Sequence, residues 1–110
     1  MNAPRPLESK IQKDIIKYLK TVPNLKYIKK DAGAYSTSGI SDLLICYRGQ
    51  FIAIEVKRPG EHPTPLQLKF LNDILMAGGG NYVAYDVEMV KRIVNTVAGF
   101  SIVINGEVIP

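Results

Sequence analysis

Along this chain, the spacing of apolar residues switches between the period of a helix and that of a strand. An amphipathic helix is predicted from Pro6 to about Thr21, and Pro23 follows it as a stop signal. The apolar positions of this helix are Leu7, Ile11, Ile15, Leu19 and Val22. Runs rich in β-branched and aromatic residues then predict strands at 25–30, 42–47 and 51–57, so one helix is followed by three strands.

The second half of the chain carries stronger start and stop signals. Thr64-Pro65-Leu66-Gln67 combines an N-cap, a first-turn proline and a capping-box glutamine, which predicts a helix to about Ala77. A strand at 81–85 and an amphipathic helix at 87–97 follow. Phe100 to Ile109 is predicted to be a hairpin. With 110 residues and no linker, the chain is predicted to be a single domain of the α/β class, covering residues 1–110.

Three ionisable residues stand in or beside the two most apolar strands. Burying a carboxylate is costly unless it is paired or bound to a cation, so Asp42, Glu55 and Lys57 predict a cation site. Arg48-Gly49-Gln50 is predicted to be a tight turn that brings the start of one strand beside the end of the next. Glu55 and Lys57 would then share a face near Asp42. A buried ion pair between Glu55 and Lys57 is the alternative explanation.

The residue types in this hairpin suit the hydrolysis of a phosphodiester. The carboxylates of Asp42 and Glu55 and the carbonyl of Val56 supply the hard oxygen ligands that Mg²⁺ or Mn²⁺ prefers. The Lys57 ammonium cannot bind a cation, but it can donate a hydrogen bond to a metal-bound hydroxide or to a phosphate oxygen. We therefore expect Lys57 to orient the nucleophile.

Four short segments occur in order between about Leu7 and Asp86. These are Glu8-Ser-Lys-Ile-Gln12, Gly39-Ile-Ser-Asp42, the run from Tyr47 that ends in Glu55-Val56-Lys57, and Thr64-Pro-Leu-Gln67. Together they resemble the VRR-NUC family of the PD-(D/E)XK nuclease superfamily, in its short stand-alone form. Two positions depart from the family pattern: Ser41 stands where a proline often precedes the aspartate, and Val83-Ala84-Tyr85 lacks the arginine of the segment that names the family.

The resemblance implies a restriction-endonuclease-like fold, with a mixed β-sheet flanked by helices. It implies an Mg²⁺- or Mn²⁺-dependent endonuclease that cuts DNA and leaves a 5′ phosphate. Glu8 would be a further metal ligand, direct or outer, and Gln67 would belong to the catalytic set. Two local explanations remain open, because Glu8 gains from the helix dipole and Gln67 completes a capping box.

Stand-alone members of the resembled family are homodimers associated with four-way (Holliday) junctions, often from phage. The resemblance therefore implies branched DNA and a second copy of the chain as partners. The predicted C-terminal hairpin is a candidate dimer interface, because its apolar strand at 100–104 would otherwise leave an exposed edge. A module that keeps the fold and binds nucleic acid without cleaving it is the alternative function.

Charge adds candidate contacts for a polyanion. The net charge of +4 and the pI of about 9.2 are compatible with nucleic-acid binding. Lysines recur at helical spacing along the first helix, and polar residues lie in the two loops around the predicted site. The candidate substrate-binding residues are Lys10, Lys13, Lys17, Ser36, Ser38 and Arg58. A solvated helix face and plain connecting loops are the alternatives.

The remaining composition mainly excludes other classes of protein. A lone Cys46 rules out an internal disulfide and a multi-cysteine zinc site, and its strand position predicts a small buried apolar side chain. No apolar run reaches the roughly 18 residues of a membrane span, and the lysine-rich start lacks the apolar segment of a secretory signal. We therefore expect a cytoplasmic protein that does not enter membranes.

Overall fold

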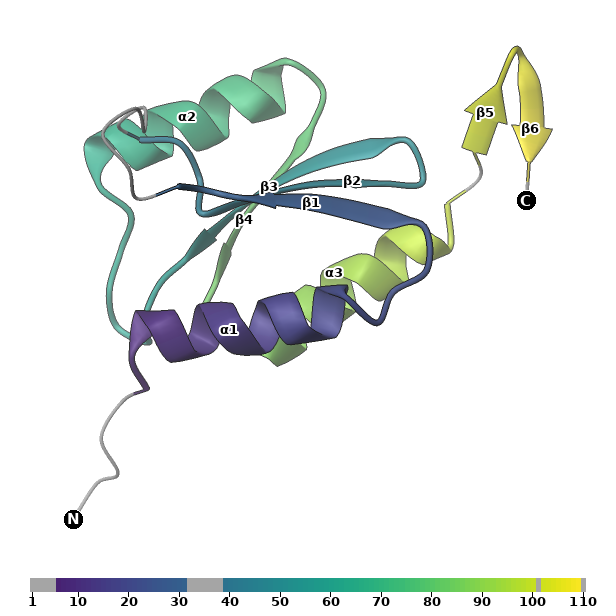
Figure 1. Ribbon diagram of the computed structural model, residues 1–110. Coiled ribbons are helices and arrows are strands. Elements are labelled where there is room, and N and C mark those ends of the chain that lie inside the picture. Colours follow the sequence, from purple (N-terminus) through teal and green to yellow (C-terminus); the bar gives the residue numbers. More distant parts are fainter. Residues whose placement is uncertain (1–5, 32–38, 101, 110) are drawn as a thin grey trace.

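The computed structural model describes residues 6–31, 39–100 and 102–109 (Figure 1). Its helices are α1 (Glu8–Leu19), α2 (Pro65–Met76) and α3 (Val87–Ala98). Its strands are β1 (Leu25–Lys29), β2 (Leu43–Tyr47), β3 (Gln50–Val56), β4 (Gly80–Ala84), β5 (Ile102–Ile104) and β6 (Glu107–Ile109). This order confirms the one predicted from the sequence. The first helix begins at Glu8 instead of Pro6, with Leu7 as its N-cap residue.

The main sheet is mixed and has the strand order β1-β2-β3-β4. The pairs β1–β2 and β2–β3 are antiparallel, whereas β3 and β4 are parallel and are connected through α2. Helix α2 covers one face of the sheet, and α1 and α3 cover the other (Figure 1). The predicted mixed sheet flanked by helices is therefore confirmed.

The two faces of the sheet are covered to different extents. On the side of α1 and α3, the alternate strand residues Leu43, Ile45, Ile52, Ile54 and Val56 pack into one core with the apolar stripes of both helices. On the other side, α2 packs against β3 and β4. The face of β2 on the α2 side therefore stays open. Cys46 lies on this face and is exposed. The burial that its strand position predicted is therefore wrong.

The turn between β2 and β3 fixes the register of the site. Arg48 and Gly49 both have positive φ, 49° and 78°, as a two-residue type I′ turn requires, and Tyr47 pairs with Gln50. The Arg48 guanidinium also donates a hydrogen bond of 2.7 Å to the Phe100 carbonyl, which holds the turn against the end of α3. The predicted tight connection is confirmed.

Strands β5 and β6 form a separate two-stranded sheet after α3. In Figure 1 this hairpin projects from the end of α3, away from the main sheet. Across the described ranges, none of the helices is both long and apolar enough to cross a membrane.

Candidate functional site

Asp42 is held between two strands, immediately before β2 begins. In the register of β2 and β3, Leu43 pairs with Ile54, so the next position places Asp42 opposite Glu55. The Val56 N–H donates a hydrogen bond of 2.8 Å to Asp42 Oδ2, and the Lys30 N–H donates one of 2.8 Å to the Asp42 carbonyl. Both the backbone and the carboxylate of Asp42 are thereby fixed in place.

Glu55 is the one charged residue in the interior of the described part of the chain, and 1% of it is exposed. Its carboxyl group shares a hydrogen bond with that of Asp42. The second oxygen, Oε2, is buried and has no hydrogen-bond partner among the described residues. None of the ion pairs found between described residues includes Glu55. The alternative of a buried Glu55–Lys57 ion pair is therefore not observed.

Burial raises the pKa of Glu55 to about 8, and the negative charge of Asp42 and the hydrogen bond between the two carboxyls act in the same direction. Lys57 and Lys30 lower this pKa, but by less. Near neutral pH, the Glu55 carboxyl group of the metal-free protein therefore holds its proton. A divalent cation can replace that proton and at the same time give Oε2 a partner.

The donor atoms at this position fit a hard divalent cation. Asp42 and Glu55 supply carboxylate oxygens. The N–H and C=O of a strand residue point to the same side, so the Val56 carbonyl lies on the side of Asp42, to which its N–H donates. Within residues 6–31, 39–100 and 102–109, no group of three or more His, Cys, Asp or Glu side chains is close enough to hold a metal. The side chains that can bind the cation directly are thus the two carboxylates.

Glu8 lies in the first turn of α1, near this pair but not grouped with it. Partial burial raises the pKa of Glu8, and the charge of Asp42 raises it further, whereas Lys57 lowers it. The charge of Asp42 therefore acts on Glu8, although, among the described residues, Glu8 does not form a group of three possible metal ligands with the two carboxylates. This placement is compatible with an outer ligand that acts through a bound water molecule.

Lys57 directly follows β3, and its N–H donates a hydrogen bond of 3.0 Å to the Ala84 carbonyl of β4. The charge of Lys57 lowers the pKa of both Glu55 and Glu8. The ammonium is therefore close to the carboxylates on either side of it. It is placed to act on a group bound at the Asp42–Glu55 pair.

Gln67 completes the capping box of α2, as its local pattern predicted. Its Oε1 accepts a hydrogen bond of 2.8 Å from the Thr64 N–H, and its own N–H donates one of 3.3 Å to Thr64 Oγ1. The start of α2 also contacts the loop that leads to Asp42, since a Cβ atom on Gly39 would lie 2.8 Å from the Leu66 carbonyl oxygen. In this structure the Gln67 side chain is committed to the helix terminus.

The candidate substrate-binding residues are spread over several surfaces. Lys13 and Lys17 are exposed on the side of α1 opposite to its buried residues, hence away from the sheet, and Lys10 pairs with Asp14 at 2.6 Å. Ser36 and Ser38 lie outside the described residues. Arg58 donates a hydrogen bond of 3.1 Å to the Pro6 carbonyl and lies 3.8 Å from Glu61. Of the described candidates, Arg58 acts on the site, because its charge lowers the pKa of Glu8, whereas Lys13 and Lys17 do not lie around the two carboxylates.

Lys30 was not among the predicted catalytic or metal-binding residues, yet it lies at the site. Its backbone binds Asp42, and its charge lowers the pKa of Glu55. Lys30 directly follows β1. Because β1 and β2 are antiparallel, this position places Lys30 opposite Asp42, which precedes β2, and the sequence could have indicated this.

The raised pKa of Glu55 predicts how the stability of the metal-free protein depends on pH. An unfolded glutamate titrates near about 4.3. Between that value and the folded value of about 8, the folded state holds more protons than the unfolded state. The free energy of unfolding should therefore fall as the pH rises through this window, by up to about 1.4 kcal/mol per pH unit.

Urea titrations of the wild type and of Glu55→Gln across this pH window measure that contribution as the difference between the two proteins. The glutamine variant should gain stability over the wild type as the pH rises. Glu88→Gln, which removes an exposed carboxylate on α3, should keep the wild-type slope. Parallel curves for the wild type and Glu55→Gln would contradict the raised pKa.

No protein-family model and no curated protein sequence matches this chain. Its structure is similar to a solved structure described as a VRR_NUC domain, with a TM-score of 0.64 and 23% sequence identity. The alignment covers 80% of this chain and 94% of that one. The similarity in three dimensions agrees with the resemblance carried by the four sequence segments. This chain therefore has the fold of a VRR_NUC domain.

Proposed function

We propose that this protein is a nuclease of the VRR-NUC family, a divalent-metal-dependent endonuclease that hydrolyses phosphodiester bonds in DNA. The observation that carries this proposal is the buried Glu55 beside the half-buried Asp42, with Glu55 Oε2 lacking a partner among the described residues, in a fold similar to a VRR_NUC domain. Burying the Glu55 carboxylate without a partner destabilises the metal-free protein, and a bound cation offsets this destabilisation.

In this proposal, Asp42, Glu55 and the Val56 carbonyl hold Mg²⁺ or Mn²⁺, with Glu8 as an outer ligand. When bound, the cation lowers the pKa of a coordinated water molecule and neutralises charge on the phosphate. Lys57 donates hydrogen bonds to the attacking oxygen and stabilises the negative charge that develops on the phosphate. The Val56 N–H keeps the Asp42 carboxylate oriented throughout, because it donates to Oδ2.

The proposed substrate is branched DNA, and the proposed active form is a homodimer. A domain of this size, with much of its surface given to the catalytic fold, has little area for reading a base sequence, so DNA shape is the favoured target. Two sites related by a two-fold axis suit a junction that presents paired scissile strands. Both features follow from the resemblance to stand-alone members of the family.

The decisive experiment is incubation with labelled junction, flap, duplex and single-stranded DNA, with and without Mg²⁺ or Mn²⁺. We expect metal-dependent cleavage, strongest on one branched form, and products that carry a 5′ phosphate. Binding of branched DNA without cleavage in any metal would instead identify a non-catalytic nucleic-acid-binding module. No response to metal and no binding of DNA would overturn both functions.

The exposed lysines of α1 give a prediction about salt. If Lys13 and Lys17 contact phosphates, the affinity for branched DNA in Ca²⁺ should fall steeply with ionic strength. Each alanine replacement should then flatten the slope of log K against log salt by up to about 0.9. The effect of Lys10→Ala should be smaller, because Asp14 already neutralises that ammonium at 2.6 Å.

Lys69→Ala is the matched control, because Lys69 is an exposed helical lysine on α2 that pairs with Asp73. Its slope should equal that of the wild type. If replacing Lys13 and Lys17 together leaves the slope unchanged, this face of α1 is simply solvated. Lys26 and Lys29 of β1 and Lys30, which follows it, then become the candidates for binding the DNA backbone.

A further inference from the structure

In the described part of the chain, no strand pairs with the outer edge of β4. The Lys57 N–H donates to the Ala84 carbonyl, so the main chain of Ala84 faces β3. Because main-chain groups alternate along a strand, those of Asn81 and Val83 point away from the sheet. The next outward group, the Tyr85 N–H, donates to the Met89 sulfur at 3.5 Å instead of to a strand. Asn81 and Val83 therefore offer a row of main-chain donors and acceptors to an added strand.

Nothing in the sequence of β4 protects this edge. Proteins commonly block an exposed strand edge with lysine, proline or a bulge. Strand β1, at the other edge of the sheet, carries Lys26 and Lys29. Strand β4 reads Gly-Asn-Tyr-Val-Ala, without a charged residue or a proline, and pairs with β3 in an unbroken register. An unprotected edge of this kind is a template on which another strand can pair.

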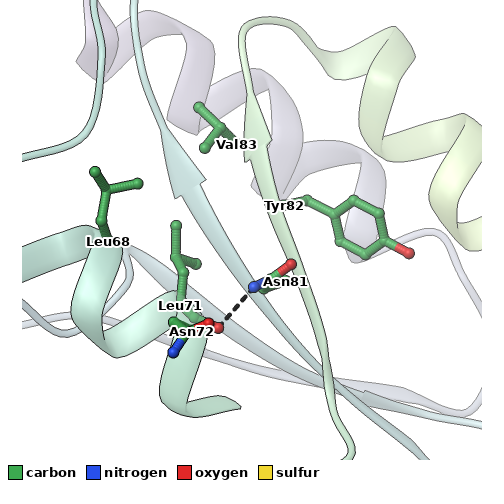
Figure 2. Close-up of a pocket in the computed structure, with 6 residues that line it drawn as sticks. All are labelled: Leu68, Leu71, Asn72, Asn81, Tyr82 and Val83. Atoms are coloured by element: carbon green, nitrogen blue, oxygen red, sulfur yellow. Dashed lines mark hydrogen bonds between the residues drawn. The ribbon is translucent and has the colours of Figure 1, made fainter. Parts of the chain in front are cut away.

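Cavities lie on both sides of the β4 edge. Figure 2 shows the first, of about 320 Å³, in which Leu68 and Leu71 of α2 face Asn81 and Val83 of β4, while Tyr82 points to the other side. The Asn81 amide donates a hydrogen bond of 2.6 Å to the Leu71 carbonyl and so fixes this wall.

The second cavity, of about 220 Å³, lies between Tyr82 and the α3 residues Met89, Arg92 and Ile93. A strand added to β4 would place alternate side chains in the two cavities, which is how sheet edges recognise extended segments.

The two-stranded sheet of β5 and β6 is not joined to a larger sheet within the described residues. Its two strands pair only with each other within the described residues, and the hairpin projects away from the main sheet (Figure 1). An isolated two-stranded hairpin is marginally stable in water. Strand β5 consists of Ile102, Val103 and Ile104 and carries no charge, whereas β6 carries Glu107. The edge of β5 is thus the better match to the uncharged edge of β4.

We propose that β5 of one copy of this chain adds to the β4 edge of a second copy. The inference rests on the homodimer of the proposed function and specifies how its two chains are joined. Exchange in both directions joins each hairpin to a four-stranded sheet and covers both open edges. Because the contact is reciprocal, it closes with two-fold symmetry instead of growing into a filament.

The test is disulfide trapping between two different chains, in a Cys46→Ser background because Cys46 is exposed. One chain carries Val83→Cys, and the other carries a cysteine at Ile102, Val103 or Ile104 in turn. Opposite residues of paired strands lie close enough for a disulfide, so at least one mixture should yield a crosslinked dimer of the two different chains. The control chain carries Lys29→Cys on the edge of β1 and should give no such product. Trapping at Lys29 as efficient as at Val83, or no trapping at all, would overturn the proposal.

A second measurement uses sedimentation of unlinked chains. Val83→Pro removes an outward N–H that the β3–β4 pairing does not use, so the fold should persist while the dimer dissociates at least about tenfold more readily. Lys29→Pro, the same change on the other edge, should leave the dimer intact. A monomeric wild type, or a dimer unaffected by Val83→Pro, would overturn the exchange. Neither readout uses cleavage. A monomer that cuts DNA therefore refutes the exchange and the homodimer but leaves the nuclease activity standing, and an exchanged dimer without activity refutes only the nuclease.

Discussion

Replacing Glu55 with glutamine is expected to abolish Mg²⁺-dependent cleavage, by at least on the order of 10³-fold. The amide keeps the shape of the side chain but lacks the charge that binds a cation. Because Glu55 is buried and its pKa is raised to about 8, the metal-free fold should tolerate the change and gain stability near neutral pH. The loss should therefore appear in both metal binding and turnover, without unfolding.

Calorimetric titration with Mn²⁺ and cleavage of the preferred DNA substrate measure the two effects separately. Glu88→Gln is again the control, since it removes an exposed carboxylate that pairs with Lys91 on α3. It should leave both properties unchanged. Full Mg²⁺-dependent activity in Glu55→Gln would remove Glu55 from the mechanism.

Replacing Lys57 with alanine should lower turnover by about 10² to 10³, the usual effect of removing one stabilising group from an active site. The affinity for the metal should change much less, because the ammonium acts on the nucleophile and on the developing phosphate charge. The charge of Lys57 also lowers the pKa of Glu55 and Glu8. Its loss should therefore raise the pH at which the metal binds, as proton release then requires a higher pH.

Measuring kcat at saturating metal over a range of pH separates these two effects of Lys57. Lys69→Ala, an exposed lysine on α2, should behave like the wild type. If Lys57→Ala abolishes metal binding but shows normal turnover at saturating metal, then Lys57 supports the cation site and not the chemical step.

The sequence by itself determined the order of the elements and the central geometry of the site. Each helix is marked by a local apolar period, and α2 and α3 also have side-chain N-caps, of which the capping box at Thr64 is the clearest. The two-residue turn at Arg48-Gly49 fixes the register of β2 and β3, so Asp42 and Glu55 had to face each other. These features depend on neighbours along the chain, and for that reason the sequence reveals them.

The tertiary structure alone decided what covers each surface. Cys46 lies on a strand whose period suggested burial, yet it is exposed because α2 packs on β3 and β4 and leaves β2 open. The lysines of α1 have helical spacing, but the packing of that helix directs Lys13 and Lys17 away from the two carboxylates. The open edge of β4 is likewise invisible in its own residues. Contacts between elements distant in sequence set all three features, and the local pattern contains no record of those contacts.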